Sequence, residues 1–125
     1  MTLVFDAGGL MSLERDERAS WVRLKSACLR GEVPLTNAAV LGQMWRGGPR
    51  QARLSQALDG IEVRPLDESL GRAAGELLAA SQQADLIDAS IVLIAHDGDE
   101  IVTTDPVDLK PLAIASGRHV ELIHP

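Results

Sequence analysis

Four aspartates stand at points where a strand or a helix is expected to begin or end. Asp6 directly follows a short apolar run, and Asp105 follows a second one. Asp88 opens a nearly continuous apolar stretch, and Asp108 comes three residues after Asp105, a spacing that places both on one face of a helix. The carboxyl ends of parallel strands meet at one edge of a sheet, so we expect these side chains to lie close together.

Clustered carboxylates indicate a bound cation. Two ionised carboxylates about 4 Å apart repel by roughly 4 kcal/mol at an effective dielectric constant of 20, so several converging ones need a cation or raised pKa values. Ligation by oxygen alone suits Mg²⁺ or Mn²⁺. The simpler alternative is that Asp88 and Asp105 are ordinary helix N-caps.

The elements that must position these residues alternate along the chain, which predicts an α/β fold with a mostly parallel central sheet. We expect the Ala-Gly-Gly sequence after Asp6 to end the first strand, and Asp67 to cap a helix. The expected strands cover residues 3–5, 33–35, 61–63, 101–102 and 119–123, and the expected helices cover residues 19–29, 38–45, 51–58, 87–95 and 106–116.

Length and composition predict one domain, residues 1–125. The chain has 125 residues, of which 46% are hydrophobic and 24% charged, enough for a core without disulfides. The single cysteine, Cys28, cannot form an internal disulfide. The sequence has neither a run of about 18 apolar residues nor a basic, apolar export signal, so we expect no membrane association and a cytoplasmic location.

The net charge of −6 is unevenly distributed. Between residues 15 and 53 there are eight Lys or Arg residues and three acidic ones. A basic region beside an acidic site could guide a polyanion, although a solvated helix face is an equally good explanation. Within this region Arg46 is a candidate contact for an RNA phosphate, or a solvated arginine at a helix end.

Three segments in order carry a family resemblance: VFDAG at residues 4–8, DLIDA at 85–89, and IVTTD at 101–105, followed by Asp108. This set resembles the PIN-domain family, and most closely the VapC-type toxins of bacterial toxin–antitoxin pairs, over nearly the whole chain. The resemblance implies a three-layer α/β/α fold and a ribonuclease dependent on Mg²⁺ or Mn²⁺. It also implies an RNA substrate, a homodimer and a cognate antitoxin protein.

The resemblance assigns roles residue by residue. Asp6, Asp88 and Asp105 match the catalytic, metal-binding carboxylates, and Asp108 matches a further acidic metal ligand. Thr103 matches a hydroxyl residue that donates a hydrogen bond to the ligands rather than binding the metal.

One position departs from the family pattern. The family has a glutamate within a Val-x-x-Glu pattern, and here Val40-Leu41-Gly42-Gln43 has an amide in its place. A neutral carbonyl oxygen attracts a divalent cation less than a carboxylate does. The alternative function is therefore a catalytically weakened module that binds RNA or the antitoxin.

A third interpretation is a receiver-type phosphoacceptor, which has a similar size and an acidic pocket. Such a protein needs an adjacent acidic pair after its first strand and a lysine after its last. Here Ala7 follows Asp6, and only His124 and Pro125 follow the last expected strand. The sequence therefore favours the ribonuclease over the phosphoacceptor.

Overall fold

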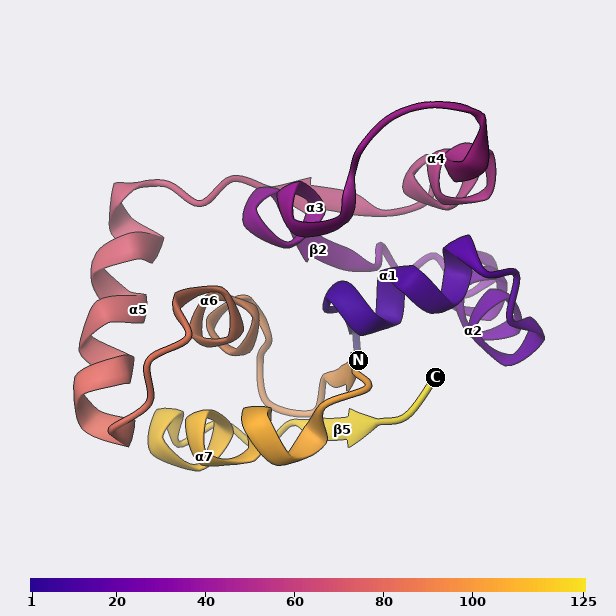
Figure 1. The fold of residues 1–125 in the computed structure, drawn as a ribbon. Helices are drawn as coiled ribbons and strands as arrows, with labels where there is room; N and C mark the ends of the chain where they lie inside the picture. The colour runs from indigo at the N-terminus through magenta and orange to yellow at the C-terminus, as the bar shows by residue number, and fades with distance from the viewer.

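The computed structural model describes residues 1–125 as a five-stranded parallel sheet with helices on both sides (Figure 1). The strand order is β3-β2-β1-β4-β5, and all four pairings are parallel. The predicted three-layer α/β/α fold is confirmed. The strands are β1 (Leu3–Phe5), β2 (Leu35–Asn37), β3 (Glu62–Arg64), β4 (Glu100–Val102) and β5 (Glu121–Ile123). The helices are α1 (Ala7–Glu14), α2 (Arg18–Leu29), α3 (Ala38–Met44), α4 (Ala52–Leu58), α5 (Glu68–Ser81), α6 (Leu86–Ile94) and α7 (Pro106–Ser116), with a 3₁₀ turn η1 (Pro49–Gln51).

The helices form two groups. Helices α1 to α4 connect β1 to β2 and β2 to β3, and α1 packs against the other three. Helices α5, α6 and α7 pack against one another and connect β3 to β4 and β4 to β5. In Figure 1, α1, α2 and α4 lie to the right of the strands, whereas α5, α6 and α7 lie to the left and below. This arrangement is that of a doubly wound sheet.

The centre of the sheet is the centre of the core. Strand β1 is buried along its whole length, with Val4 paired to Leu35 on one side and Ile101 on the other. Both faces of such a strand must be covered, which is why β1 and α6 are apolar without alternation. No single helix is long and apolar enough to cross a membrane; α5 and α6 together satisfy that test only across a 109° bend, and the apolar side chains of α6 belong to the core.

Two elements differ from the expectations. The first strand ends before the Ala-Gly-Gly sequence, as expected, but that sequence also begins α1, a helix that was not expected. Its glycines allow close packing, because a Cβ on Gly8 would lie 2.1 Å from Thr104 Oγ1 and one on Gly9 would lie 2.5 Å from the Val102 carbonyl oxygen. Strand β2 covers residues 35–37 rather than 33–35, since Pro34 has no N–H to donate to the ladder.

Candidate metal centre

The predicted site residues meet at the switch point of the sheet. Asp6 directly follows β1, Thr103 directly follows β4, and these two strands are neighbours paired at Phe5 and Val102. The connection that leaves β1 goes to one helix layer, and the one that leaves β4 goes to the other. In open parallel sheets this divergence creates a crevice at the carboxyl ends of the strands, where ligands bind.

Asp6 is a buried carboxylate in this crevice, with 7% of its surface exposed. It is also the N-cap of α1, since its Oδ1 accepts a 2.9 Å hydrogen bond from the N–H of Gly9. Burial raises the pKa of Asp6, hydrogen bonds from Thr103 and Gly9 oppose the rise, and the charge of Asp105 adds to it. The hydrogen bonds from Thr103 and Gly9 therefore favour the ionised carboxylate of Asp6, whereas its burial favours the protonated form.

Thr103 connects two of the predicted ligands. Its side chain is fully buried and donates a hydrogen bond to the carboxylate of Asp6. The same hydroxyl oxygen accepts a 2.9 Å hydrogen bond from the N–H of Asp105. Thr103 thus holds both aspartates without itself being needed as a ligand.

Asp88 lies in the first turn of α6, but it is not the cap. The cap is Asp85, whose Oδ1 accepts hydrogen bonds of 3.0 Å from the N–H groups of Ile87 and Asp88. The N-cap explanation for Asp88 is therefore wrong, and its carboxylate makes no such bond. Desolvation, followed by the negative charges of Asp85, Asp6, Asp108 and Asp105, raises the pKa of Asp88 to about 6.

We call Asp6, Asp88, Asp105 and Asp108 the acidic cluster. Asp105 and Asp108 are its two members on α7 and at its N-terminus. Asp105 occupies the N-cap position of α7, yet its side chain makes no capping hydrogen bond. Asp108 lies in the first turn of the same helix, and both side chains are exposed. The capping role does not account for either carboxylate, so both are free to turn toward a ligand.

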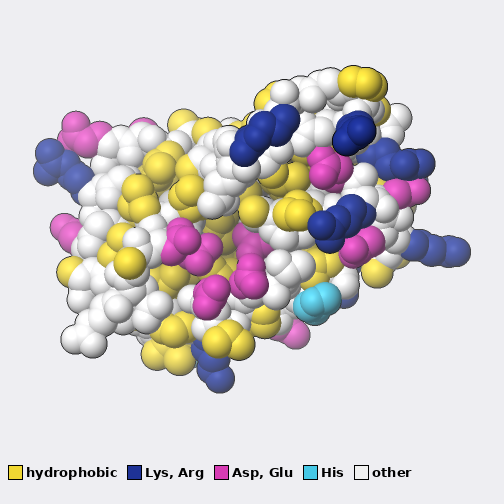
Figure 2. Space-filling model, viewed as in Figure 1, with side chains coloured by type: hydrophobic (Ala, Val, Ile, Leu, Met, Phe, Trp, Pro, Cys, Tyr) yellow, Lys and Arg dark blue, Asp and Glu magenta, His cyan; other side chains and the backbone are white.

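The acidic cluster suits a hard divalent cation in its chemistry. All its donors are carboxylate oxygens, and acidic side chains gather at the centre of the face seen in Figure 2. No group of three or more His, Cys, Asp or Glu side chains stands at ligating distance in the structure. Binding of an ion here would require the exposed side chains of Asp105 and Asp108 to turn toward the anchored Asp6.

Gln43 and Arg46 lie at the end of α3. Gln43 is exposed and is in the last turn of the helix. The guanidinium of Arg46 turns back onto that helix, donating hydrogen bonds to the carbonyl oxygens of Trp45 (2.7 Å), Gln43 (3.1 Å) and Gly42 (3.3 Å). As it stands, Arg46 stabilises a helix end, as the simpler of its two interpretations predicts.

Sequence reasoning missed a buried polar pair next to the acidic cluster. Asn37, the last residue of β2, donates a 2.7 Å hydrogen bond to the hydroxyl of Ser90 on α6, and both side chains are fully buried. The one signal in the sequence is a serine within the apolar stretch after Asp88. Its partner could not be identified without the tertiary arrangement.

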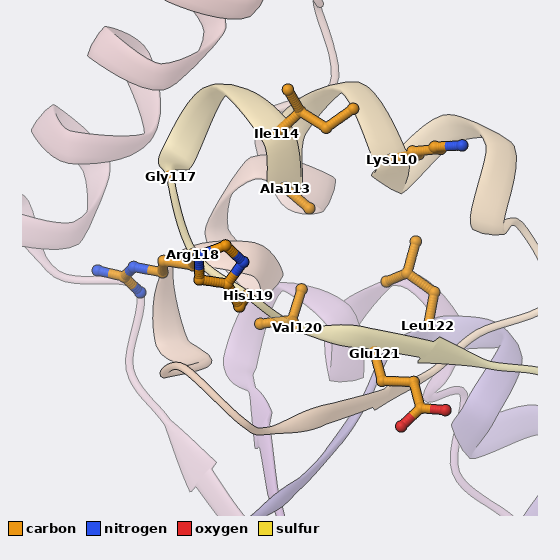
Figure 3. A pocket seen from close by; sticks show the side chains of 9 residues that line it. All are labelled: Lys110, Ala113, Ile114, Gly117, Arg118, His119, Val120, Glu121 and Leu122. Atoms are coloured by element: carbon orange, nitrogen blue, oxygen red, sulfur yellow. The ribbon is translucent and has the colours of Figure 1, made fainter.

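The larger cavities lie elsewhere. One cavity, of about 550 Å³, is a trough between α7 and β5, where Val120 and Leu122 point toward the helix and Glu121 points away (Figure 3). Neither this cavity nor four others of about 240 to 420 Å³ is lined by any member of the acidic cluster. None of these five cavities therefore provides an enclosed small-molecule site at the acidic cluster.

The comparison with solved structures decides the fold family. The chain superimposes on a chain from the crystal structure of VapBC2 from Rickettsia felis bound to a DNA fragment from their promoter, with a TM-score of 0.69 over 98% of this chain and 99% of that one. The chain has a PIN-like fold. The two chains are 13% identical, so the PIN fold is shared despite extensive sequence divergence. No protein-family model and no curated protein matches the chain.

Proposed function

We propose that this chain is a divalent-metal-dependent endoribonuclease and the toxin of a toxin–antitoxin pair, acting in the cytoplasm. The observation that carries the proposal is the acidic cluster at the switch point of a PIN fold. The raised pKa of Asp88 supports it, since the first causes after desolvation are the charges of neighbouring carboxylates. Structural proteins rarely retain such a repulsive arrangement, whereas active sites often use it.

The residues of the cluster differ in what they contribute. Asp6, held by Thr103 and Gly9, provides the fixed ligand. Asp88, Asp105 and Asp108 complete the oxygen shell from the first turns of two helices, where the helix dipole favours negative charge. A Mg²⁺ or Mn²⁺ ion held by them supplies charge neutralisation at the scissile phosphate and activation of a water molecule.

The substrate that suits this crevice is RNA, a polyanion that needs both a cation at the cleaved phosphate and basic side chains beside it. Figure 2 shows Lys and Arg side chains on the same face as the central acidic group, toward α1 and α4. Arg46, in the loop after α3, and Arg50, within η1, are exposed and are the nearest basic residues in sequence to Gln43. Arg46 can serve a phosphate only by leaving the carbonyl groups of α3.

An antitoxin is the partner that the fold suggests, since the matched chain comes from a VapBC2 complex. The α2–α4 groove, a cavity of about 400 Å³, offers an apolar docking surface lined by Leu24, Cys28, Leu29 and Ala57, with Lys25 at its border. Leu29 is 88% exposed and lies next to the other apolar side chains of this groove, and contiguous exposed apolar surface marks interaction sites. We also propose that the toxin forms a homodimer and that an antitoxin Arg or Lys replaces the cation among the carboxylates.

The second candidate function is a binding module with weakened catalysis. Gln43 favours it, because this residue stands where the resemblance implies a glutamate. Such a module would keep the antitoxin and RNA surfaces but would bind a divalent ion poorly.

Cleavage of structured RNAs by the pure protein in Mg²⁺ or Mn²⁺ tests the proposal, with Asp6→Asn as the matched control. We expect cleavage that EDTA abolishes and that Asp6→Asn lacks. Because Asn keeps the acceptor for Gly9 and removes a buried charge, the variant should melt at the same or a higher temperature. A folded wild-type protein that cleaves no RNA in either metal would favour the binding module, and a destabilised, inactive Asp6→Asn would indicate a structural cap.

A further inference from the structure

Asn37 makes two buried hydrogen bonds that join two helices. Its Oδ1 accepts a 2.9 Å bond from the N–H of Val40 and so caps α3, and its Nδ2 donates a 2.7 Å bond to the hydroxyl of Ser90 on α6. The Ser90 hydroxyl in turn donates a 2.6 Å bond to the carbonyl oxygen of Ile87. One amide side chain therefore has contacts with α3, which carries Gln43, and with α6, which carries Asp88.

The pair lies directly beside the acidic cluster. Strand β2, which ends at Asn37, pairs with β1, which ends just before Asp6. The residue before Asn37 strengthens this junction, because the Thr36 hydroxyl donates a 2.8 Å hydrogen bond to the carbonyl oxygen of Phe5. The end of β2 is therefore hydrogen bonded to the end of β1 through Thr36 and to α6 through Asn37.

The C-terminal end of α6 is held by Arg118, which donates hydrogen bonds to the carbonyl oxygens of Val92, Leu93 and Ala95, so the end that carries Asp88 needs a directional contact of its own. The other buried side chains of α6, Ala89, Ile91, Val92 and Ile94, are apolar. Apolar packing is not directional and tolerates small rotations and shifts, whereas a buried amide N–H must keep its acceptor. A rotation of α6 that moved Asp88 would break the bond between Asn37 and Ser90 and leave both groups unpaired in the core.

We infer that Asn37, acting through Ser90, is a positioning residue that sets the orientation of α6 and thereby holds Asp88 toward Asp6. The orientation of α6 is a property of the fold itself. Its consequence for the bound cation rests on the proposed function.

Two variants separate this role from simple capping. Asn37→Ser keeps a good N-cap for α3 but has a side chain too short to reach Ser90, and Ser90→Ala removes the acceptor from the other side. Ser20→Ala is the matched control, because Ser20 is also a buried helical serine, whose hydroxyl bonds to Ser12 at 2.6 Å on α1. Asn37→Ser and Ser20→Ala each lose one buried side-chain hydrogen bond, whereas Ser90→Ala also loses the bond from Ser90 to the carbonyl oxygen of Ile87.

Two measurements on the full chain provide the test. Residual dipolar couplings of backbone amides, recorded without metal or RNA, report the orientation of α6 relative to the sheet. Titration with Mn²⁺ alone reports the affinity of the cluster. We expect both Asn37→Ser and Ser90→Ala to change the couplings of α6 and to weaken Mn²⁺ binding about 10- to 100-fold, as loss of residues that support metal ligands does. The double variant should be no weaker than either single one, and Ser90→Thr, which keeps the hydroxyl, should restore the affinity.

The outcomes distinguish this inference from the proposed function. Couplings of α6 that match those of the wild type in both variants would overturn the inference, as would an equal effect of Ser20→Ala on Mn²⁺ affinity. A wild-type protein that binds no Mn²⁺ would overturn the proposed function, and the dipolar couplings would still decide the role of Asn37. If Asn37→Ser does not fold, Ser90→Ala alone gives the same decision.

Discussion

The hydroxyl oxygen of Thr103 accepts a 2.9 Å hydrogen bond from the N–H of Asp105 while its proton goes to the carboxylate of Asp6. A single buried side chain directly after β4 therefore interacts with two acidic residues that are 99 positions apart in the sequence. The acidic cluster is organised by such neutral groups as much as by the strands that carry its aspartates.

Replacement of Thr103 by valine tests this link. Valine has a similar shape but no hydroxyl, so the pKa of Asp6 should rise further, because the bond from Thr103 lowers it. Mn²⁺ affinity should fall about 10- to 100-fold. Thr103→Ser should retain both properties. The measurements are carboxyl titration by NMR and Mn²⁺ binding, and an unchanged pKa of Asp6 in Thr103→Val would contradict the assignment.

The raised pKa of Asp88 predicts how stability depends on pH. The pKa is about 6 in the folded protein and 3.8 in the reference state, so between these values the folded chain binds more protons than the unfolded chain. Stability must then fall as pH rises through this window. Asp6, whose pKa is also raised, contributes in the same direction.

Chemical denaturation of the metal-free protein between pH 4 and 7 measures this effect. The wild type should gain stability on acidification relative to Asp88→Asn, and the two should differ most at pH 7. Metal affinity should show the opposite trend and fall as pH drops below about 6, because the ligands must be ionised. Parallel pH profiles for the two proteins would show that Asp88 does not titrate in this range.

Gln43→Glu should lower the metal concentration that gives half-maximal cleavage, since a carboxylate attracts a hard divalent ion more than an amide does. Gln43→Ala should change that concentration little. Metal titrations of the three proteins measure the difference. Superimposable curves would mean that position 43 lies outside the metal shell and that the resemblance misassigns it.

Gly9→Ala should destabilise the protein, because the added Cβ would lie 2.5 Å from the backbone carbonyl oxygen of Val102. Backbone atoms must move to relieve such a contact, at a cost of about 1–3 kcal/mol. Gly42→Ala on α3 is the control, since its Cβ would meet nothing within 4 Å and alanine should stabilise that helix by about 0.5–1 kcal/mol. Relative to the wild type, we expect the free energy of unfolding to fall in Gly9→Ala and to rise in Gly42→Ala. Equal changes in the two variants would show that α1 can move away from β4.

Leu29→Glu should weaken the binding of a co-expressed antitoxin at least tenfold, because it places a charge in the α2–α4 groove. Ile114→Glu is the control: Ile114 is 70% exposed, comparable with 88% for Leu29, but it lies on α7. The affinity of each purified variant for the antitoxin provides the measurement. Loss of binding in Ile114→Glu alone would move the docking surface to α7.

Much of this fold could be predicted from local sequence. The apolar run at residues 3–5 and the apolar stretch after Asp88 correspond to β1 and α6, because a segment buried on every side has no need for polar residues. The existence of α1 could not be predicted in the same way. Its glycines oppose helix formation locally and are required by contacts with Thr104 and Val102, which are distant in sequence.

The site shows the same division. The aspartates stand out because they interrupt or follow apolar segments, and the placement of Asp6 after β1 and of Asp105 after β4 could be expected from the sequence. The functions of Asp85 as a cap and of Asn37 as the partner of Ser90 depend on side-chain geometry and on which elements pack together. No spacing rule connects residues 37 and 90.

The pairing of β1 with β4 also determines when the site can form during synthesis. Leu3 lies opposite Glu100, so one of the two paired strands is translated at the start of synthesis and the other after about 100 residues. Contacts between such distant residues form late and slowly, because a long loop must close first. The nascent polypeptide therefore has no assembled acidic centre while the ribosome is still producing the segment before β4. The proposed nuclease would therefore lack a working centre while the message and the ribosome are still making the first four-fifths of its chain.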